Sequence, residues 1–140
     1  MIRFFNEDTN YRPRNIRRLR AWIDHVIRLE NKMPRDCVFI FCSDKVLLKL
    51  NRQYLKRDTL TDVIAFDMSE RPEEVSGDIY ISIDRVRENA RKFSQRVEKE
   101  IHRVMVHGVL HLIGYNDSSQ ELKAQMRNLE DHYLVLLERI

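Results

Sequence analysis

The chain has 140 residues, a length typical of one domain with one hydrophobic core. Hydrophobic residues make up 43% of it, whereas Gly and Pro number three each, which excludes a low-complexity linker. The net charge is only +3, but residues 1–35 hold nine Lys and Arg against four Asp and Glu, and residues 85–103 hold seven against three. Such basic segments suit a polyanionic partner, although most charged runs are solvated helix faces. No run is long enough to cross a bilayer, and the start does not resemble a signal peptide, so we expect a cytoplasmic protein with a single domain over residues 1–140 and no membrane partner.

The first 83 residues are predicted to alternate strands and helices. Strands are expected at residues 2–7, 37–42, 63–68 and 77–83, and helices at 15–31, before Pro34, and from a cap at Ser43 to Tyr54. The apolar runs 37–42 and 63–68 are typical of inner strands that are covered on both faces. Cys37 and Cys42 would then point to opposite faces of the first run, so we expect two free thiols in a reducing compartment.

The second half is predicted to be helical. Helices are expected from an Asp84 cap to Phe93, from Ser94 to Gly114, and from a capping box at Ser118 and Glu121 to Ile140. Strands and helices alternate too unequally for a repeated βαβ fold. The pattern predicts an α+β fold, in which about five helices pack on a mixed sheet of about four strands.

Two histidines in the long helix carry the strongest chemical signal. His107 and His111 lie one turn apart on one helix face, where two imidazoles can bind one metal ion. Gly114 follows where a helix can end with positive φ, and the returning chain would bring Asp117 beside the rings. Two nitrogens and one oxygen, with coordination positions left open, are typical of a catalytic zinc site. We therefore expect one zinc ion, or another divalent transition metal, on these three residues.

The spacing of these ligands also occurs in zinc peptidases, but the residue after the first histidine argues against that activity. In peptidases of this kind that residue is Glu, the general base, whereas here it is Gly108. Other candidates are assigned to roles outside the metal site. His25 is a surface or core-edge residue, His102 lies about 140° away around the helix, and His132 is structural. Met126 belongs to the core, and Glu100 is a supporting or surface residue. Asp62 is a possible base, although we favour a role in holding its loop through hydrogen bonds.

The run His-Gly-x-Leu-His-Leu-x-Gly-Tyr at residues 107–115 resembles the signature of the YbeY family, bacterial metal-dependent endoribonucleases that act in ribosomal RNA maturation. The resemblance extends over residues 51–66 and 77–82 and downstream to Met126 and Glu130. Two positions depart from the family pattern. Asp117 stands where the family usually has a third His, and Leu55 stands where it usually has Arg.

The resemblance implies a single-strand-specific, metal-dependent endoribonuclease that acts in rRNA processing. Its partners would be RNA, chiefly rRNA in pre-ribosomal particles, and possible ribosomal proteins. Lys56 and Arg57 become the candidate RNA contacts, whereas Lys123 and Arg127, in an acidic segment, are expected to matter less. No catalytic group is identified beyond a metal-bound water. Two alternatives stay open: a metal hydrolase of another substrate class, and a non-catalytic ribosome-associated factor with a structural metal.

Overall fold

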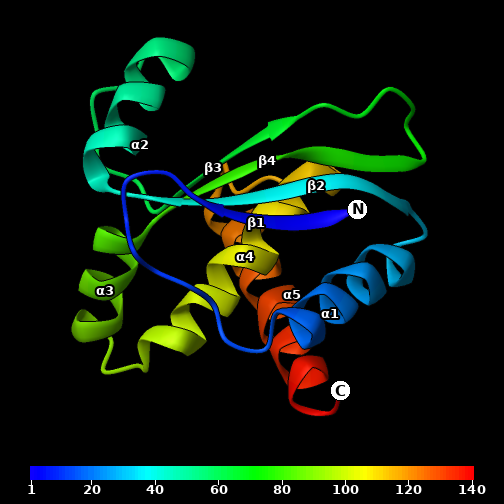
Figure 1. Cartoon of the computed structure of the whole chain (residues 1–140). Coiled ribbons are helices and arrows are strands. Elements are labelled where there is room, and N and C mark those ends of the chain that lie inside the picture. The colour runs from blue at the N-terminus through cyan, green and yellow to red at the C-terminus, as the bar shows by residue number, and fades with distance from the viewer.

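The computed structural model describes residues 1–140 as one sheet with helices on both faces (Figure 1). In chain order the elements are β1 (Ile2–Asn6), α1 (Ile16–Leu29), β2 (Met33–Cys42), α2 (Asp44–Leu50), a π-helical turn (Asn51–Leu55), β3 (Val63–Asp67), β4 (Glu74–Ser82), α3 (Ile83–Lys92), α4 (Val97–Ile113) and α5 (Gln120–Glu138). The predicted α+β fold is confirmed.

The sheet has four strands in the order β1-β2-β4-β3. β1 pairs with β2 and β2 pairs with β4 in parallel, whereas β3 pairs with β4 in antiparallel orientation, so the sheet is mixed as predicted. The prediction that residues 63–68 form an inner strand is wrong, because β3 lies at the edge and β4 takes the inner position. Both faces of β3 are nevertheless covered by side chains. Val63 and Ala65 pack against the large hydrophobic core on one face of the sheet, and Ile64 packs against Leu47 of α2 and Cys42 on the other.

One face of the sheet carries the main core and the other a small cluster. Helices α1, α4 and α5 lie on the first face, and α2 lies on the second (Figure 1). Cys37 faces the main core and Cys42 the small cluster, so the two thiols point to opposite faces as predicted and remain unpaired. Burial raises the pKa of Cys37 to about 11 and that of Cys42 to about 12, which keeps both thiols protonated and unreactive.

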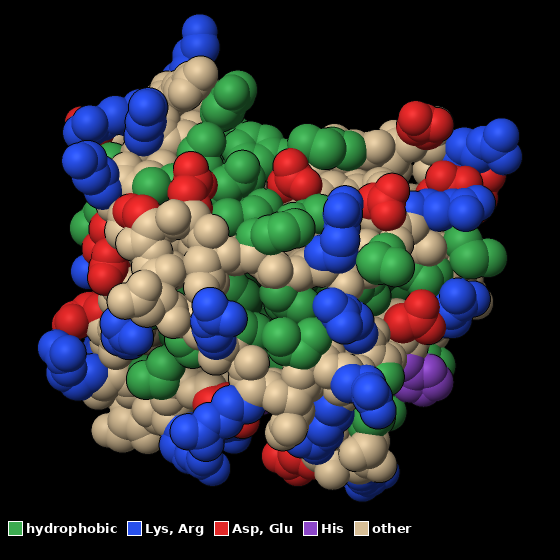
Figure 2. Space-filling view, in the orientation of Figure 1, with side chains coloured by type: hydrophobic (Ala, Val, Ile, Leu, Met, Phe, Trp, Pro, Cys, Tyr) green, Lys and Arg blue, Asp and Glu red, His purple; other side chains and the backbone are tan.

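The surface seen in Figure 2 is mixed. Hydrophobic side chains gather near the middle of this face, and Lys and Arg side chains surround them. No helix of the chain is both long enough and apolar enough to cross a membrane.

The helix ends differ from the predicted ones in ways that local chemistry explains. α1 ends at Leu29 and the chain turns at Asn31, which has φ 61°, so that Pro34 lies inside β2 and does not end the helix. Ser82, and not Asp84, caps α3: its hydroxyl accepts a hydrogen bond from the Arg85 N–H at 3.2 Å.

Similar differences occur around α4 and α5. Ser94 has φ 52° and lies in a turn, so α4 begins only at Val97. α5 is capped by Ser119, whose hydroxyl accepts from the Leu122 N–H at 3.1 Å, and not by Ser118. Two aromatic side chains near the ends of predicted helices are exposed, Tyr54 at 58% and Phe93 at 60%.

Candidate metal centre

Helix α4 lies so close to the sheet that only glycine fits at position 108. A Cβ atom on Gly108 would lie 2.6 Å from Cγ2 of Ile79 on β4, which is closer than two carbons can approach. The side of α4 that carries Gly108 therefore faces β4, while His107 and His111 reach into the cavity on another side. This packing explains why a peptidase-like Glu does not follow the first histidine: the position belongs to the core.

The turn after α4 brings Asp117 back to the two rings. Gly114 ends the helix with φ 124°, and the N–H of Tyr115 bonds back to the Leu110 carbonyl at 3.0 Å. The Nε2 atoms of His107 and His111 lie 3.0 Å apart, and Oδ2 of Asp117 lies 3.7 Å and 3.8 Å from them. In a tetrahedral zinc site, ligand atoms about 2.0–2.1 Å from the ion are about 3.3 Å apart, a value that these three separations bracket.

Hydrogen bonds at Nδ1 of each histidine ring determine that Nε2 is the nitrogen without a proton, which can bind a metal ion. Nδ1 of His111 lies 3.1 Å from the Tyr115 carbonyl oxygen, and Nδ1 of His107 lies 2.7 Å from Oε2 of Glu130. A carbonyl or carboxylate oxygen only accepts, so each neutral ring carries its proton on Nδ1. Both Nε2 atoms then carry free lone pairs at short distance from each other and from Oδ2 of Asp117. Three electron-rich atoms converging in this way repel one another unless a cation lies between them, so the residues present fit a bound metal ion.

Glu130 is the functional residue that reasoning from the ligand spacing missed. It lies on α5, is only 5% exposed, and is held by Arg103 at 2.9 Å on its other oxygen. Burial lowers the pKa of His107, but the hydrogen bond and the charge of Glu130 outweigh burial and raise that pKa overall. Burial and the neighbouring His107 lower the pKa of His111. Carboxylates behind metal-binding histidines commonly orient the ring and increase its basicity.

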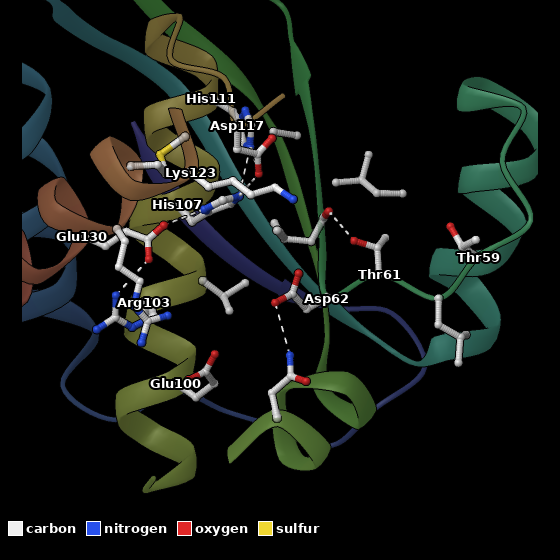
Figure 3. A pocket seen from close by; sticks show the side chains of 18 of the residues that line it. Thr59, Thr61, Asp62, Glu100, Arg103, His107, His111, Asp117, Lys123 and Glu130 are labelled. Atoms are coloured by element: carbon white, nitrogen blue, oxygen red, sulfur yellow. Dashed lines mark hydrogen bonds and ion pairs between the residues drawn. The ribbon is translucent and has the colours of Figure 1, made fainter. Parts of the chain in front are cut away.

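The candidate ligands open into a cavity of about 720 Å³ (Figure 3). Its walls come from the π-helical turn and the loop that follows it, from β3, from the end of α3, and from α4 and α5. Arg57 lines this cavity but Lys56 does not, so only one of the two predicted RNA contacts shares the cavity with the candidate ligands. Lys123 and Arg127 also line it, whereas the expectation that they matter less for RNA cleavage stays a prediction.

Two acidic side chains, Asp62 and Glu100, also line the cavity but do not belong to the candidate ligand group (Figure 3). Asp62 accepts a hydrogen bond from the side chain of Asn89 at 3.4 Å, and burial raises its pKa. Glu100 is only 9% exposed, so it is not a surface residue, and burial followed by the charge of Asp62 raises its pKa.

The other three histidines do not belong to the candidate ligand group, and Met126 lies in the core as predicted. His25 and His132 are exposed on α1 and α5, and His102 packs edge-on against Trp22 with 6.1 Å between ring centroids. Met126 is buried in the main core.

Fold and side chains together define an α+β protein with an open His-His-Asp group of the kind that binds a catalytic metal. A family model described as Endoribonuclease YbeY matches residues 4–138, and the chain therefore belongs to the YbeY family.

Individual relatives agree with this assignment. The chain is 44% identical over 135 residues to an Endoribonuclease YbeY of Cytophaga hutchinsonii, which covers 96% of the chain and 94% of the relative. It is 48% identical over 132 residues to that of Flavobacterium psychrophilum, which covers 94% of each. Among solved structures, the solution structure of a Thermotoga maritima protein superposes with a TM-score of 0.65 at 28% identity, over 98% of this chain and 89% of that one.

Proposed function

We propose that this protein is a metal-dependent endoribonuclease that cleaves single-stranded RNA in rRNA processing and ribosome maturation. Family membership supports the reaction class, since the relatives bear the name Endoribonuclease YbeY. One observation in the structure supports the metal dependence: two histidines with their Nε2 lone pairs free converge with Asp117 at the wall of a large cavity. We infer that His107, His111 and Asp117 hold one zinc ion or another divalent transition metal.

Each residue of the site has a definite part in this chemistry. A bound metal ion supplies a Lewis acid, which makes water more acidic and draws charge from a phosphate oxygen. Glu130 keeps the proton of His107 on Nδ1 and so keeps Nε2 available as a ligand. Asp117 adds a negative charge where a third histidine would be neutral, which favours harder ions than a three-histidine site would.

Four cationic side chains line the cavity. Arg103 is engaged by Glu130 and Asp131, and the other three suit a phosphodiester substrate. Arg57, Lys123 and Arg127 line the same cavity as the candidate ligands. Hydrolysis of a phosphodiester develops negative charge, which fixed cations near the metal stabilise. These residues come from the loop before β3 and from α5, so an RNA strand crossing the cavity would meet positive charge from two elements. Lys56 remains a candidate for an RNA contact outside the cavity.

The wider setting follows from the same proposal. Residues 1–140 would act as one catalytic domain in the cytoplasm, with rRNA in pre-ribosomal particles as substrate and ribosomal proteins as neighbours. A peptidase is a poor alternative, because Gly108 packs against Ile79 and leaves no room for the general base. A purely structural metal is also a poor alternative, because three protein ligands leave positions open to substrate.

The test compares zinc-loaded protein with chelated protein on single-stranded rRNA fragments, on the corresponding duplexes and on a peptide mixture. We expect cleavage of single-stranded RNA only, lost on chelation and restored by the metal. Arg57→Glu should reduce cleavage with full metal content, and the matched variant Lys56→Glu should reduce it less, because only Arg57 lines the cavity. Peptide cleavage, or RNA cleavage that survives chelation, would contradict the proposal.

A further inference from the structure

Glu100 is a buried charged group that the metal site does not use. Its side chain lies in the first turn of α4, is 9% exposed, and points into the cavity below Asp62 in Figure 3. No hydrogen bond or ion pair joins its carboxylate to the rest of the protein. Arg103, the cation one turn away, is already engaged by Glu130 at 2.9 Å and Asp131 at 2.6 Å. The carboxylate lines the cavity and accepts no hydrogen bond from the protein, so its two oxygens are free to accept donors from a ligand.

The surroundings of Glu100 suit a flat ligand with polar edges. Phe93 lines the same cavity and is 60% exposed, so one aromatic ring is available for stacking. Asn89, one helical turn before Phe93, also lines the cavity and bonds to Asp62. Proteins that bind single-stranded RNA commonly stack unpaired bases on aromatic side chains and read the base edges with polar groups.

From this juxtaposition we propose that Glu100, Phe93 and Asn89 form a subsite for one unpaired nucleobase, and that Glu100 selects guanine. The proposal rests on the proposed function, because the RNA strand would be placed by the metal site and by the cations in the same cavity. The pKa of Glu100 is raised, first by burial and then by the charge of Asp62, which agrees with a carboxylate that accepts no hydrogen bond from the protein.

Guanine is favoured because of its pattern of donors. Its N1–H and its N2 amino group are adjacent donors, which the two oxygens of one carboxylate can accept together. Uracil has a single N–H between two carbonyl oxygens, and those oxygens would repel Glu100. Adenine and cytosine each have an amino group beside an acceptor nitrogen, so only one good bond forms. A site built around such donors discriminates strongly against ligands that lack them, because its own polar group is then left unpaired.

The test uses the zinc-loaded full chain and 2′-O-methyl RNA pentamers, and each pentamer is checked to be intact after the titration. Each has a central guanine, hypoxanthine or adenine between uracils, and affinities are measured by calorimetry. We expect the guanine pentamer to bind about tenfold or more tightly than the adenine pentamer, with hypoxanthine between them because it lacks the 2-amino group. Glu100→Gln should abolish the preference. The control Glu98→Gln, on the same helix but outside the cavity, should preserve it.

Variants of Phe93 distinguish stacking on the base from recognition of the base edge by Glu100. Phe93→Ala should weaken binding of all three pentamers by a similar factor, about fivefold or more, and Phe93→Tyr should restore it. Zinc content and Tm, measured on every variant, show that Glu100→Gln is folded and loaded. Equal binding of the three pentamers by the native chain, or a guanine preference that survives in Glu100→Gln, would overturn the proposal. A Mn²⁺ titration of the zinc-loaded protein gives a further check. If the native chain binds Mn²⁺ and Glu100→Gln does not, Glu100 holds a cation and the proposal is overturned.

The outcome separates this inference from the proposed function. Selective guanine binding without RNA cleavage would support the subsite and refute the ribonuclease. Metal-dependent RNA cleavage without any guanine preference at or beside the cut would refute the subsite and leave the ribonuclease intact.

Discussion

Replacing Glu130 by glutamine tests how the metal site is held. The carboxylate is buried, accepts the Nδ1–H of His107 at 2.7 Å, and is fixed by Arg103 at 2.9 Å. Glutamine keeps the size of the side chain but removes the charge, so the ring loses its ionic acceptor and becomes less basic at Nε2. Loss of such a partner behind a metal ligand typically weakens metal binding 10–100-fold, or about 1.4–2.7 kcal/mol.

The effect on stability follows from mass action. At a free zinc concentration 1,000 times the native Kd, binding stabilises the native fold by about 4.1 kcal/mol. Glu130→Gln at the same zinc concentration would lose about 1.4–2.7 kcal/mol of this stabilisation. For a domain of this size that loss corresponds to about 4–10 °C of the zinc-induced rise in Tm. Comparing the zinc-induced rise, and not Tm itself, removes the effect of Glu130 on the metal-free fold.

The assay is a zinc titration by competition with a chromogenic chelator, together with thermal unfolding of metal-free and zinc-loaded protein. Asp131→Asn is the matched control, because Asp131 contacts Arg103 at 2.6 Å from the exposed side and does not contact His107. It should change the zinc Kd by less than about threefold, as expected for a loss at an exposed ion pair. A zinc Kd within twofold of native in Glu130→Gln would refute the role assigned to Glu130.

Further predictions concern the ligands, the pH dependence and the packing of α4. His107→Ala and His111→Ala should each lose stoichiometric zinc, measured by elemental analysis, whereas the exposed His25→Ala should keep it; retention by all three would contradict the ligand assignment. Asp117→Ala should weaken zinc binding by more than about tenfold and Asp117→His should retain it, since one of three ligands is removed or exchanged; an unchanged Kd in Asp117→Ala would place the third ligand elsewhere. Without metal, the raised pKa of His107 contributes stability that is fully present below about pH 6.5 and lost as the pH rises through the raised pKa. Zinc competes with the ring proton, so the zinc-induced rise in Tm should grow over the same increase in pH, and a rise that shrinks would contradict the pairing. Gly108→Ala should destabilise the fold by about 1–3 kcal/mol in denaturant unfolding, because its Cβ would meet Ile79 at 2.6 Å; an unchanged midpoint would show that α4 can move off the sheet.

Local sequence patterns predicted the parts of the site that lie within one short segment. His107, His111, Gly114 and Asp117 span only eleven residues, and helical spacing plus one glycine turn is enough to bring them together. The element types were also predictable, because the helices have apolar residues at helical spacing and the strands are short apolar or alternating runs.

Features that depend on tertiary packing were not predictable in this way. Glu130 reaches His107 from another helix, 23 residues further along the chain, and an acidic residue in an amphipathic helix carries no local sign of such a partner. The edge position of β3 depends on which side of β4 pairs with β2, which the apolar run of β3 does not encode. Lys123 and Arg127 line the cavity because of where α5 packs, and not because of the charge of their own segment.

The most direct test of the central claim measures zinc content and RNA cleavage on the same samples of the native chain and of His111→Ala. His111 belongs to the candidate ligand group and takes no part in the main core. We expect the native chain to contain one zinc ion and to cleave single-stranded RNA, to lose both on chelation, and to regain both with one equivalent of zinc. His111→Ala should remain folded, bind no stoichiometric zinc and leave the RNA intact. Cleavage at the native rate by zinc-free protein would contradict the account.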